Sequence, residues 1–225
     1  MSNLDFPFQI IRSKRKTAAI HVKANQVQVR IPHFVDDSWA MHFLQGKSSW
    51  VKQKLQQQNQ YAQTVPKIAH NEKILWLGDR LTLQFDPSVN AVLAEGNELR
   101  VPANTSQQAL ALLEAFFKQQ AKRYMVDRTH DIAKKYGLSQ KLSSIRFRRT
   151  KTKWGHCTSK GVIQYNWLIM GAPVSVIDYL ICHELSHLNH PNHSKAFWAH
   201  VASMCPDYKN QQIWLKQNSM ALSWC

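Results

Sequence analysis

The sequence predicts an α+β protein in which a β-rich N-terminal lobe precedes a compact core built mainly from helices. Before residue 102, short segments alternate apolar and polar residues, which is typical of strands. After it, apolar residues recur every three or four positions over longer segments, which is typical of helices. We therefore expect two domains, residues 1–102 and 103–225, and the hydrophobic content of 44% is sufficient for a buried core.

Several short strands and one helix make up the expected N-terminal lobe. The helix should run from Asp37 to about Gln60, where it enters a glutamine-rich run. Turns are expected at Gly78-Asp79 and at Gly96-Asn97, between runs of strand-forming residues. The strands themselves are expected at residues 8–11, 18–22, 27–31, 74–77, 81–85, 91–93 and 99–101.

A long helix opens the second half of the chain, with Thr105 or Ser106 as its N-cap and Gly137 at its end. A helix that starts at Pro173 is expected further on, and Ser194 is expected to cap another helix after it. Between the long helix and Pro173 the pattern predicts two strands, at residues 145–149 and 162–169.

The helix that starts at Pro173 contains the run His183-Glu184-Leu185-Ser186-His187. Its two histidines are about one turn apart along the helix and about 40° apart in direction, so both imidazoles can bind one metal ion. Glu184 lies about 60° from His187 and therefore flanks that ion, which is where a general base must stand. This spacing is typical of a zinc-hydrolase site.

Helical periodicity places these three groups in the sector of the helix that is expected to face the core. The opposite sector holds the polar residues Ser175, Asp178, Cys182, Ser186 and Asn189. Burial of a carboxylate and two imidazoles without a partner is costly. A metal ion that holds all three is therefore favoured over the alternative, two surface histidines on an amphipathic helix.

His193 is the expected third ligand, because Pro191 ends the helix and lets the chain turn back toward the metal. His190 and His200 are competing candidates. Three protein ligands leave the fourth position of a tetrahedral Zn²⁺ open for water, and no fourth ligand occurs at zinc-finger spacing. The predicted chemistry is hydrolysis, most simply of an amide, with Glu184 as the base that accepts the proton of the water.

Further motifs give the chain a family resemblance. They are Arg12 to Thr17, Trp50-Val51, Trp154 to Gly161, Tyr165 to Leu168, Asp178-Tyr179, His183 to Leu188, Asn192 to Ser194, Phe197-Trp198 and Pro206 to Tyr208. Together they resemble the YgjP-like metal-dependent hydrolases, which belong with the SprT-like and WLM-domain zinc peptidases. The resemblance implies a compact zincin-like catalytic core with an HExxH active-site helix, in which His183, His187 and His193 bind zinc and Glu184 is catalytic.

Two positions depart from related patterns, and the group that stabilises the oxyanion stays open. His156 stands where relatives usually carry a serine, and His190 replaces the glycine that makes the turn in metzincins. An oxyanion needs a hydrogen-bond donor aimed at it, for which His156, Tyr165, Tyr208 and Arg149 are candidates. Tyr165, Tyr208 and Arg149 also have alternatives without a role in catalysis: the tyrosines could fill gaps in the core, and Arg149 could be solvated.

The net charge of +15 favours an acidic partner. Basic clusters at Arg12 to Lys16 and Arg146 to Lys153 suit a phosphate backbone, and Trp154 suits stacking on a base. Two functions therefore stay open. The first is a zinc-dependent metallopeptidase that acts on a polypeptide. The alternative is a nucleic-acid- or nucleotide-associated protein, in which the metal is structural or hydrolyses phosphate esters. The same charge also fits a solubilising surface or a cleft for acidic peptides. In a peptidase, the strands before the metal helix would either add an extended substrate to a free edge or merely cover the helix.

The cytoplasm is the expected location. The N-terminus has no basic segment followed by an apolar run, and nowhere do about 18 apolar residues follow one another, so neither export nor membrane insertion is expected. The cysteines are too widely spaced to predict a disulfide framework or a cysteine zinc site: Cys157, Cys182, Cys205 and Cys225. The sequence does not specify an oligomeric state.

Overall fold

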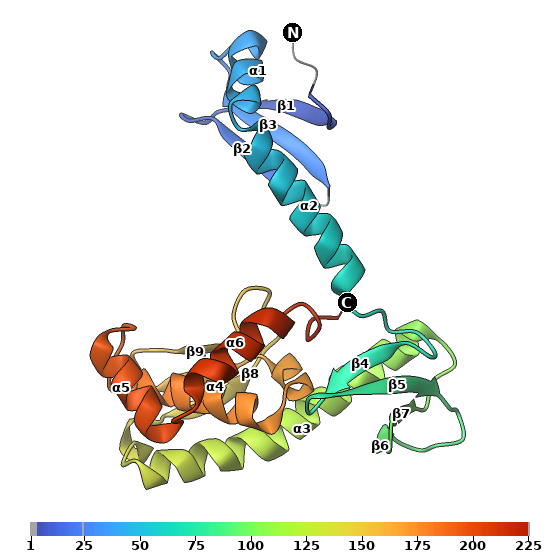
Figure 1. Ribbon diagram of the computed structural model, residues 1–225, viewed down its shortest axis with the longest axis vertical. Coiled ribbons are helices and arrows are strands. Elements are labelled where there is room, and N and C mark those ends of the chain that lie inside the picture. The colour runs from blue at the N-terminus through green and yellow to red at the C-terminus, as the bar shows by residue number, and fades with distance from the viewer. Residues whose placement is uncertain (1–3, 24, 225) are drawn as a thin grey trace. The chain divides into compact units, whose positions relative to one another are not determined.

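The computed structural model describes residues 4–23 and 25–224, with the side chains of residues 60–64 excepted. The chain forms two compact units, Met1–Thr64 and Val65–Cys225. The described residues contain six α-helices and three small sheets, which confirms the α+β fold class (Figure 1).

The first unit packs a three-stranded sheet against two helices. Its central strand β3 pairs in parallel with β1 and antiparallel with β2, and its alternate residues Val27, Val29 and Ile31 are buried. The single helix expected from Asp37 is broken at Gly46, because glycine is a poor helix former. The elements are β1 (Phe8–Ser13), β2 (Ala19–Lys23), β3 (Gln26–Pro32), α1 (Asp37–Gln45) and α2 (Ser48–Thr64).

A four-stranded sheet begins the second unit and shares its hydrophobic core with the long helix α3 (Ser106–Lys135). Leu83 and Leu99 of the sheet belong to the same buried cluster as Leu113 and Phe117 of α3. The units therefore divide after Thr64 and not at the expected boundary of 102/103, since the sheet and the helix bury each other's apolar faces. In the order β4-β5-β7-β6, the strands are β4 (Lys73–Trp76), β5 (Asp79–Phe85), β7 (Glu98–Val101) and β6 (Leu93–Glu95).

Helix α3 runs along the second unit, from this sheet to the region of α4 (Figure 1). Thr105 is its N-cap, and the Thr105 Oγ1 accepts a hydrogen bond from the Gln108 amide at 3.3 Å. The helix contacts β7 at one end of the unit and α4 (Val174–Ser186) further along. It thereby supports the part of the chain that contains the HExxH run.

A second sheet in this unit lies beside α4. Its order is β8-β10-β9, with β10 parallel to β8 and antiparallel to β9, so β9 is an edge strand that contacts α4. β10 ends at Tyr165 and not at residue 169, because Asn166 Oδ1 accepts a hydrogen bond from the Leu168 amide and begins a 3₁₀ helix. The elements are η1 (Ser139–Lys141), β8 (Ser144–Phe147), β9 (Gly155–Cys157), β10 (Val162–Tyr165) and η2 (Trp167–Gly171).

Helix α4 is buried on almost every side, because α3, α5 (Lys195–Met204), α6 (Tyr208–Asn218) and β9 all contact it. Cys182 and Ser186 were expected in an exposed polar sector, yet both are buried. The Ser186 hydroxyl donates to the Cys182 carbonyl at 2.8 Å, and Asp178 accepts hydrogen bonds from Tyr124 and Arg128 of α3. The polar sector is satisfied inside the protein, which fixes α4 in the middle of the unit.

None of the described helices is long and apolar enough to cross a membrane. Cys157, Cys182 and Cys205 are free thiols, and Cys225 lies outside the described residues.

Candidate active site

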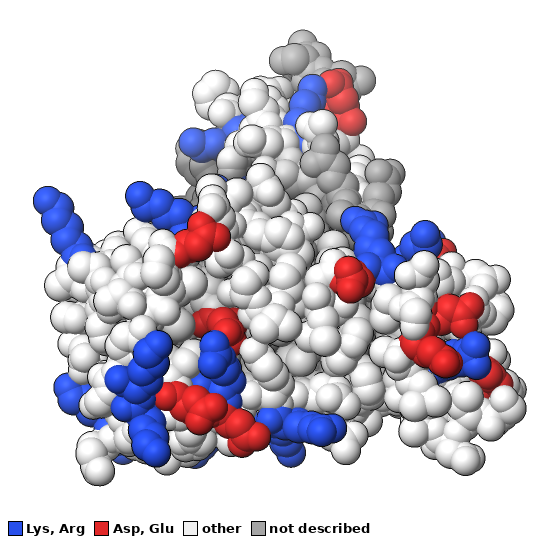
Figure 2. Space-filling view, turned by 60° about the horizontal axis from the view of Figure 1, so that its bottom comes forward, with Lys and Arg blue, Asp and Glu red and all other residues white. Residues whose placement is uncertain are grey.

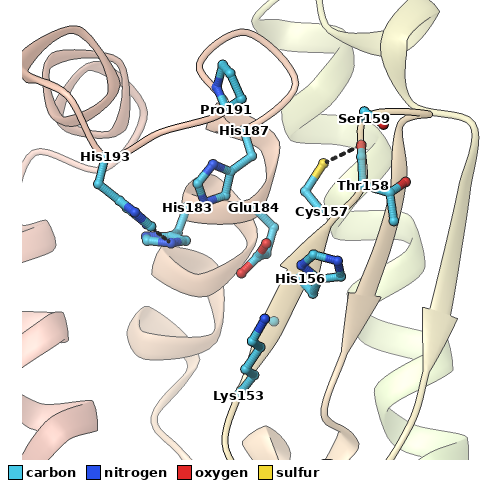
Figure 3. A pocket seen from close by; sticks show the side chains of 11 residues that line it. Lys153, His156, Cys157, Thr158, Ser159, His183, Glu184, His187, Pro191 and His193 are labelled. Atoms are coloured by element: carbon cyan, nitrogen blue, oxygen red, sulfur yellow. Dashed lines mark hydrogen bonds between the residues drawn. The ribbon is translucent and has the colours of Figure 1, made fainter.

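The HExxH residues lie at the C-terminal end of α4, beside a cavity of about 340 Å³. Glu184 is buried with 3% of its surface exposed, whereas His183 and His187 are half-buried. The helix periodicity therefore predicted correctly that these groups face inward. The opposite wall of the cavity comes from β9 and the residues around it (Figure 3).

Three imidazoles converge at this cavity. The ring nitrogens of His183, His187 and His193 that can bind a metal all lie within 4.8 Å of one another. The Nε2 atoms of His183 and His193 are 3.2 Å apart. Two nitrogens that bind one tetrahedral zinc at about 2.0–2.1 Å are separated by roughly 3.3 Å, so the spacing fits a shared ion.

The turn after α4 brings His193 to the other two histidines. The helix ends at Ser186, and the His190 amide donates to the Ser186 carbonyl at 3.0 Å as the chain turns. The His190 carbonyl lies 3.1 Å from the Nδ1 of His187 and can only accept, so that nitrogen carries the hydrogen and Nε2 is free to bind a metal. Ser194 then caps α5 as expected, accepting from the Phe197 amide at 3.4 Å.

The competing histidines lie elsewhere. The rings of His190 and His200 pack against each other, with centroids 5.4 Å apart, and neither belongs to the converging group. The metzincin glycine is therefore not needed for this turn, since His190 contributes its backbone carbonyl while its side chain points to His200.

Aromatic side chains of α5 hold the three imidazoles in place. The Phe197 ring lies 5.0, 4.5 and 4.7 Å from the rings of His183, His187 and His193, measured between centroids. Trp198 packs against His183 and His193 at 5.8 and 5.7 Å. Phe197 and Trp198 belong to the motifs that gave the family resemblance, but no contact with the histidines was predicted for them, because these contacts depend on the turn between α4 and α5.

Burial favours the neutral form of His183 and His187. Desolvation, together with the neighbouring His187 and His193, lowers the pKa of His183 to about 3. Burial also lowers the pKa of His187. A neutral imidazole has a free lone pair, which is the form that binds a metal ion.

Glu184 is held next to the three imidazoles without a hydrogen-bond partner for its Oε2 atom among the described residues. Burial raises the pKa of its carboxyl to about 8, and the positive charge of Lys153 opposes part of that rise. A buried carboxyl group without a hydrogen-bond partner on its Oε2 atom lies beside three converging imidazoles, so these residues fit the metal implied by the HExxH spacing.

The family of the chain follows from a match that extends far beyond these few residues. The family model described as "YgjP-like, metallopeptidase domain" matches residues 16–218. The chain belongs to the YgjP-like family. Membership makes the protein a metal-dependent peptidase at the level of its family, in agreement with the resemblance drawn from the motifs.

Comparison with other proteins adds a partial structural likeness. The metallopeptidase zymogen of Pyrococcus abyssi abylysin is similar in structure to part of this YgjP-like chain, with 21% sequence identity and a TM-score of 0.38. The similarity covers 41% of this chain and 93% of that chain. No curated protein sequence matches the chain significantly.

Only one of the four candidate oxyanion donors in the YgjP-like chain lines the cavity. His156 of β9 does so, with an exposed side chain. Tyr165 is buried with its hydroxyl 3.2 Å from that of Thr129, and the Tyr208 ring stacks on Trp198. Arg149 binds Glu114 at 3.0 Å and the Trp224 carbonyl.

Several residues that line the cavity lie in motifs identified from the sequence but were not predicted to belong to the active site. The lining consists of Lys153, Gly155, His156, Cys157, Thr158, Ser159, His183, Glu184, His187, Pro191 and His193. Burial raises the pKa of the Cys157 thiol to about 11, so this cysteine is a packing residue with little thiolate character. Lys153 was identified only as the end of the basic cluster Arg146 to Lys153, directly before the Trp154-Gly155 motif, and not as a residue of the site.

Proposed function

We propose that this YgjP-like protein is a zinc-dependent peptidase in which His183, His187 and His193 bind the ion and Glu184 is the general base. The convergence of three imidazoles next to a buried carboxylate, at the wall of an open cavity, carries the proposal. Zinc is favoured over harder ions because all three protein donors are imidazole nitrogens, and hard ions such as Mg²⁺ prefer oxygen.

A zinc ion held by His183, His187 and His193 would lower the pKa of a bound water molecule to about 7 and polarise the substrate carbonyl. Glu184 accepts a proton from the water and passes it to the nitrogen of the leaving amine.

The edge strand β9 supports an extended polypeptide as the substrate. One edge of β9 pairs with β10, and its residues Gly155, His156 and Cys157 line the cavity opposite Glu184. A substrate that adds as a further strand would gain backbone hydrogen bonds while its scissile bond lies near the three imidazoles. His156 is the best-placed candidate for a side-chain contact to the oxyanion, since it alone of the four candidates lines the cavity.

The alternative, a nucleic-acid- or nucleotide-associated protein, has less support. Trp154, expected to stack on a base, is half-buried against the core, and Arg149 is paired with Glu114. On the face shown in Figure 2, basic side chains are interspersed with acidic ones and form no single patch.

We also propose a cytoplasmic location, because the three described cysteines are free thiols.

Metal analysis and a cleavage assay test the proposed function together. The purified protein should contain one zinc ion per chain, and the zinc-loaded protein should cleave an unfolded polypeptide. Glu184→Gln should retain the zinc and lose cleavage, because the amide keeps the shape of the side chain but accepts no proton. Cleavage by the variant at the wild-type rate would overturn the role of Glu184, and cleavage of phosphate esters in place of peptides would favour the alternative.

A further inference from the structure

Lys153 is the one lysine or arginine among the eleven residues that line the cavity, and Glu184 is the one carboxylate. Figure 3 shows the Lys153 side chain pointing toward the Glu184 carboxylate from the segment just before β9. The Lys153 side chain is exposed, and the lining contains no Asp or Glu besides Glu184. The cavity therefore combines a metal-binding end with a single cationic group.

The Lys153 ammonium forms no ion pair within the part of the chain that the structure describes. The described ion pairs all join other residues, and Glu184 lies beyond the 4.0 Å that defines such a pair. An exposed ammonium next to a cavity, without a carboxylate of its own protein, is available to a carboxylate of a ligand. Its charge also disfavours a cationic ligand group at the same place.

The direction of β9 indicates which part of a substrate would meet Lys153. Lys153 precedes the first residue of β9, Gly155, while Thr158 and Ser159 follow its last residue. Antiparallel pairing is somewhat more stable than parallel pairing, so an added substrate strand is expected to run opposite to β9. In that direction, the residues C-terminal to the scissile bond lie at the Lys153 end and those N-terminal to it lie near Thr158.

The role proposed for Glu184 also places the substrate residue C-terminal to the scissile bond near Lys153, by an independent argument. The carboxylate that hands its proton to the leaving amine must lie beside that nitrogen, which begins the C-terminal product. Lys153 points toward this carboxylate in Figure 3, and its charge acts on it. The residue that bears the leaving amine is therefore the substrate residue nearest to Lys153.

We propose that Lys153 is a specificity-determining residue that binds a carboxylate on the substrate residue directly C-terminal to the scissile bond. This inference rests on the proposed peptidase function and adds the class of substrate to it. The carboxylate has two sources, an Asp or Glu side chain within a longer chain or the free C-terminus of a chain that ends at this residue. Both offer the same anionic oxygens to the ammonium.

Matched peptides test the inference on the zinc-loaded protein. One series carries Glu, Gln or Lys after the scissile bond and continues to an amidated end. A second series ends at that residue with a free or an amidated terminus. The wild-type protein should cleave the Glu peptide with a kcat/KM about five- to tenfold above that of the Gln peptide, as one partly solvated ion pair provides. A preference of this size only for the free terminus would assign the site to chain ends, and a preference only for Glu would assign it to side chains.

Two variants of Lys153 and one control complete the test. In Lys153→Met, the Glu and Gln peptides should be cleaved with about equal kcat/KM, and the loss of preference should arise mainly from KM. Lys153→Glu should cleave the Lys peptide in preference to the Glu peptide. Lys151→Met removes an exposed charge that does not line the cavity, and should keep the wild-type preference. A Lys153→Met protein that cleaves every peptide more slowly but keeps the wild-type preference would overturn the inference, since Lys153 would then act on Glu184 alone.

The same assay separates the inference from the function on which it rests. If the zinc-loaded wild-type protein cleaves none of the peptides, both the peptidase function and the role of Lys153 are overturned. If it cleaves them without preferring a carboxylate, only the role of Lys153 is overturned.

Discussion

Gly155 of β9 lies so close to Glu184 of α4 that a Cβ atom at residue 155 would overlap the carboxylate. Glycine is therefore required here by the neighbouring side chain, since the backbone of Gly155 is not in the left-handed region where the structure finds four other glycines. This approach of strand and helix leaves Glu184 one position, between β9 and the three imidazoles.

Gly155→Ala should impair catalysis more than it impairs metal binding. The added methyl group displaces the carboxylate, which must be placed within a fraction of an ångström for proton transfer, so kcat/KM should fall by about a hundredfold or more. Zinc content should stay near one per chain, measured by metal analysis. Gly46→Ala is the matched control, because the nearest atom outside its chain neighbours, the His42 carbonyl oxygen, would lie 3.6 Å from an added methyl group. Wild-type kcat/KM in Gly155→Ala would show that the approach is unimportant.

Glu184 makes the stability of the metal-free protein depend on pH. Burial raises its pKa from 4.5 to about 8, so the folded chain holds a proton that the unfolded chain releases between these values. This stabilisation is complete below about pH 4.5 and is lost as the pH rises through 8, at up to about 1.4 kcal/mol per pH unit.

Urea unfolding in the presence of a chelator measures this effect. Glu184→Gln removes the titration, so the difference in the free energy of unfolding between the variant and the wild type should move in favour of the variant from pH 5 to pH 8. The comparison isolates Glu184, because His183 titrates equally in both proteins. A difference that stays constant over this range would contradict the raised pKa.

His193→Ala should remove the third ligand and weaken zinc binding by about a hundredfold or more. His190→Ala and His200→Ala are the matched controls, because both rings lie outside the converging group. Their zinc affinity, measured by competition with a chelating dye, should stay within a few-fold of the wild type. If either control lost zinc strongly while His193→Ala retained it, the histidine replaced in that control would be the third ligand in place of His193.

Asp178→Asn should destabilise the protein without affecting the metal. The Asp178 carboxylate accepts from Tyr124 at 2.9 Å and from Arg128 at 2.6 Å, and so joins α3 to α4 on the side away from the imidazoles. Loss of this partly exposed, charge-assisted contact should cost about 1–2 kcal/mol, measured by chemical denaturation. Asp5→Asn breaks the exposed pair with Lys52 and should leave the unfolding midpoint unchanged. Equal effects of the two substitutions would contradict a special role for the α3–α4 contact.

The sequence predicted most of what local patterns encode. The HExxH run, the inward direction of Glu184 and the caps at Thr105 and Ser194 all follow from residues close together in the chain. Most strands of the three sheets were predicted too, because runs of strand-forming residues are separated there by turn residues.

What the sequence did not predict depends on contacts between distant segments. Strand β9 consists of Gly155, His156 and Cys157, which have no strand pattern of their own and become a strand only by pairing with β10. Tyr165 and Arg149 are occupied by partners from α3 and the C-terminus, which no spacing reveals. The division between the units lies after Thr64 and not at the expected 102/103 for the same reason. Local composition does not indicate that α3 and the β4–β7 sheet share one core.

The burial of α4 on almost every side separates two tasks along the chain. Residues 183, 184 and 187 belong to a helix that cannot shift without repacking α3, α5 and α6. The segment from Lys153 to Ser159 is different: Lys153, His156 and Ser159 are exposed, while Trp154 and Cys157 pack against the core. In the proposed peptidase, replacement of the exposed Lys153, with Gly155 and His156 kept, would therefore change the substrate preference while the buried helix keeps its histidines and Glu184 in place.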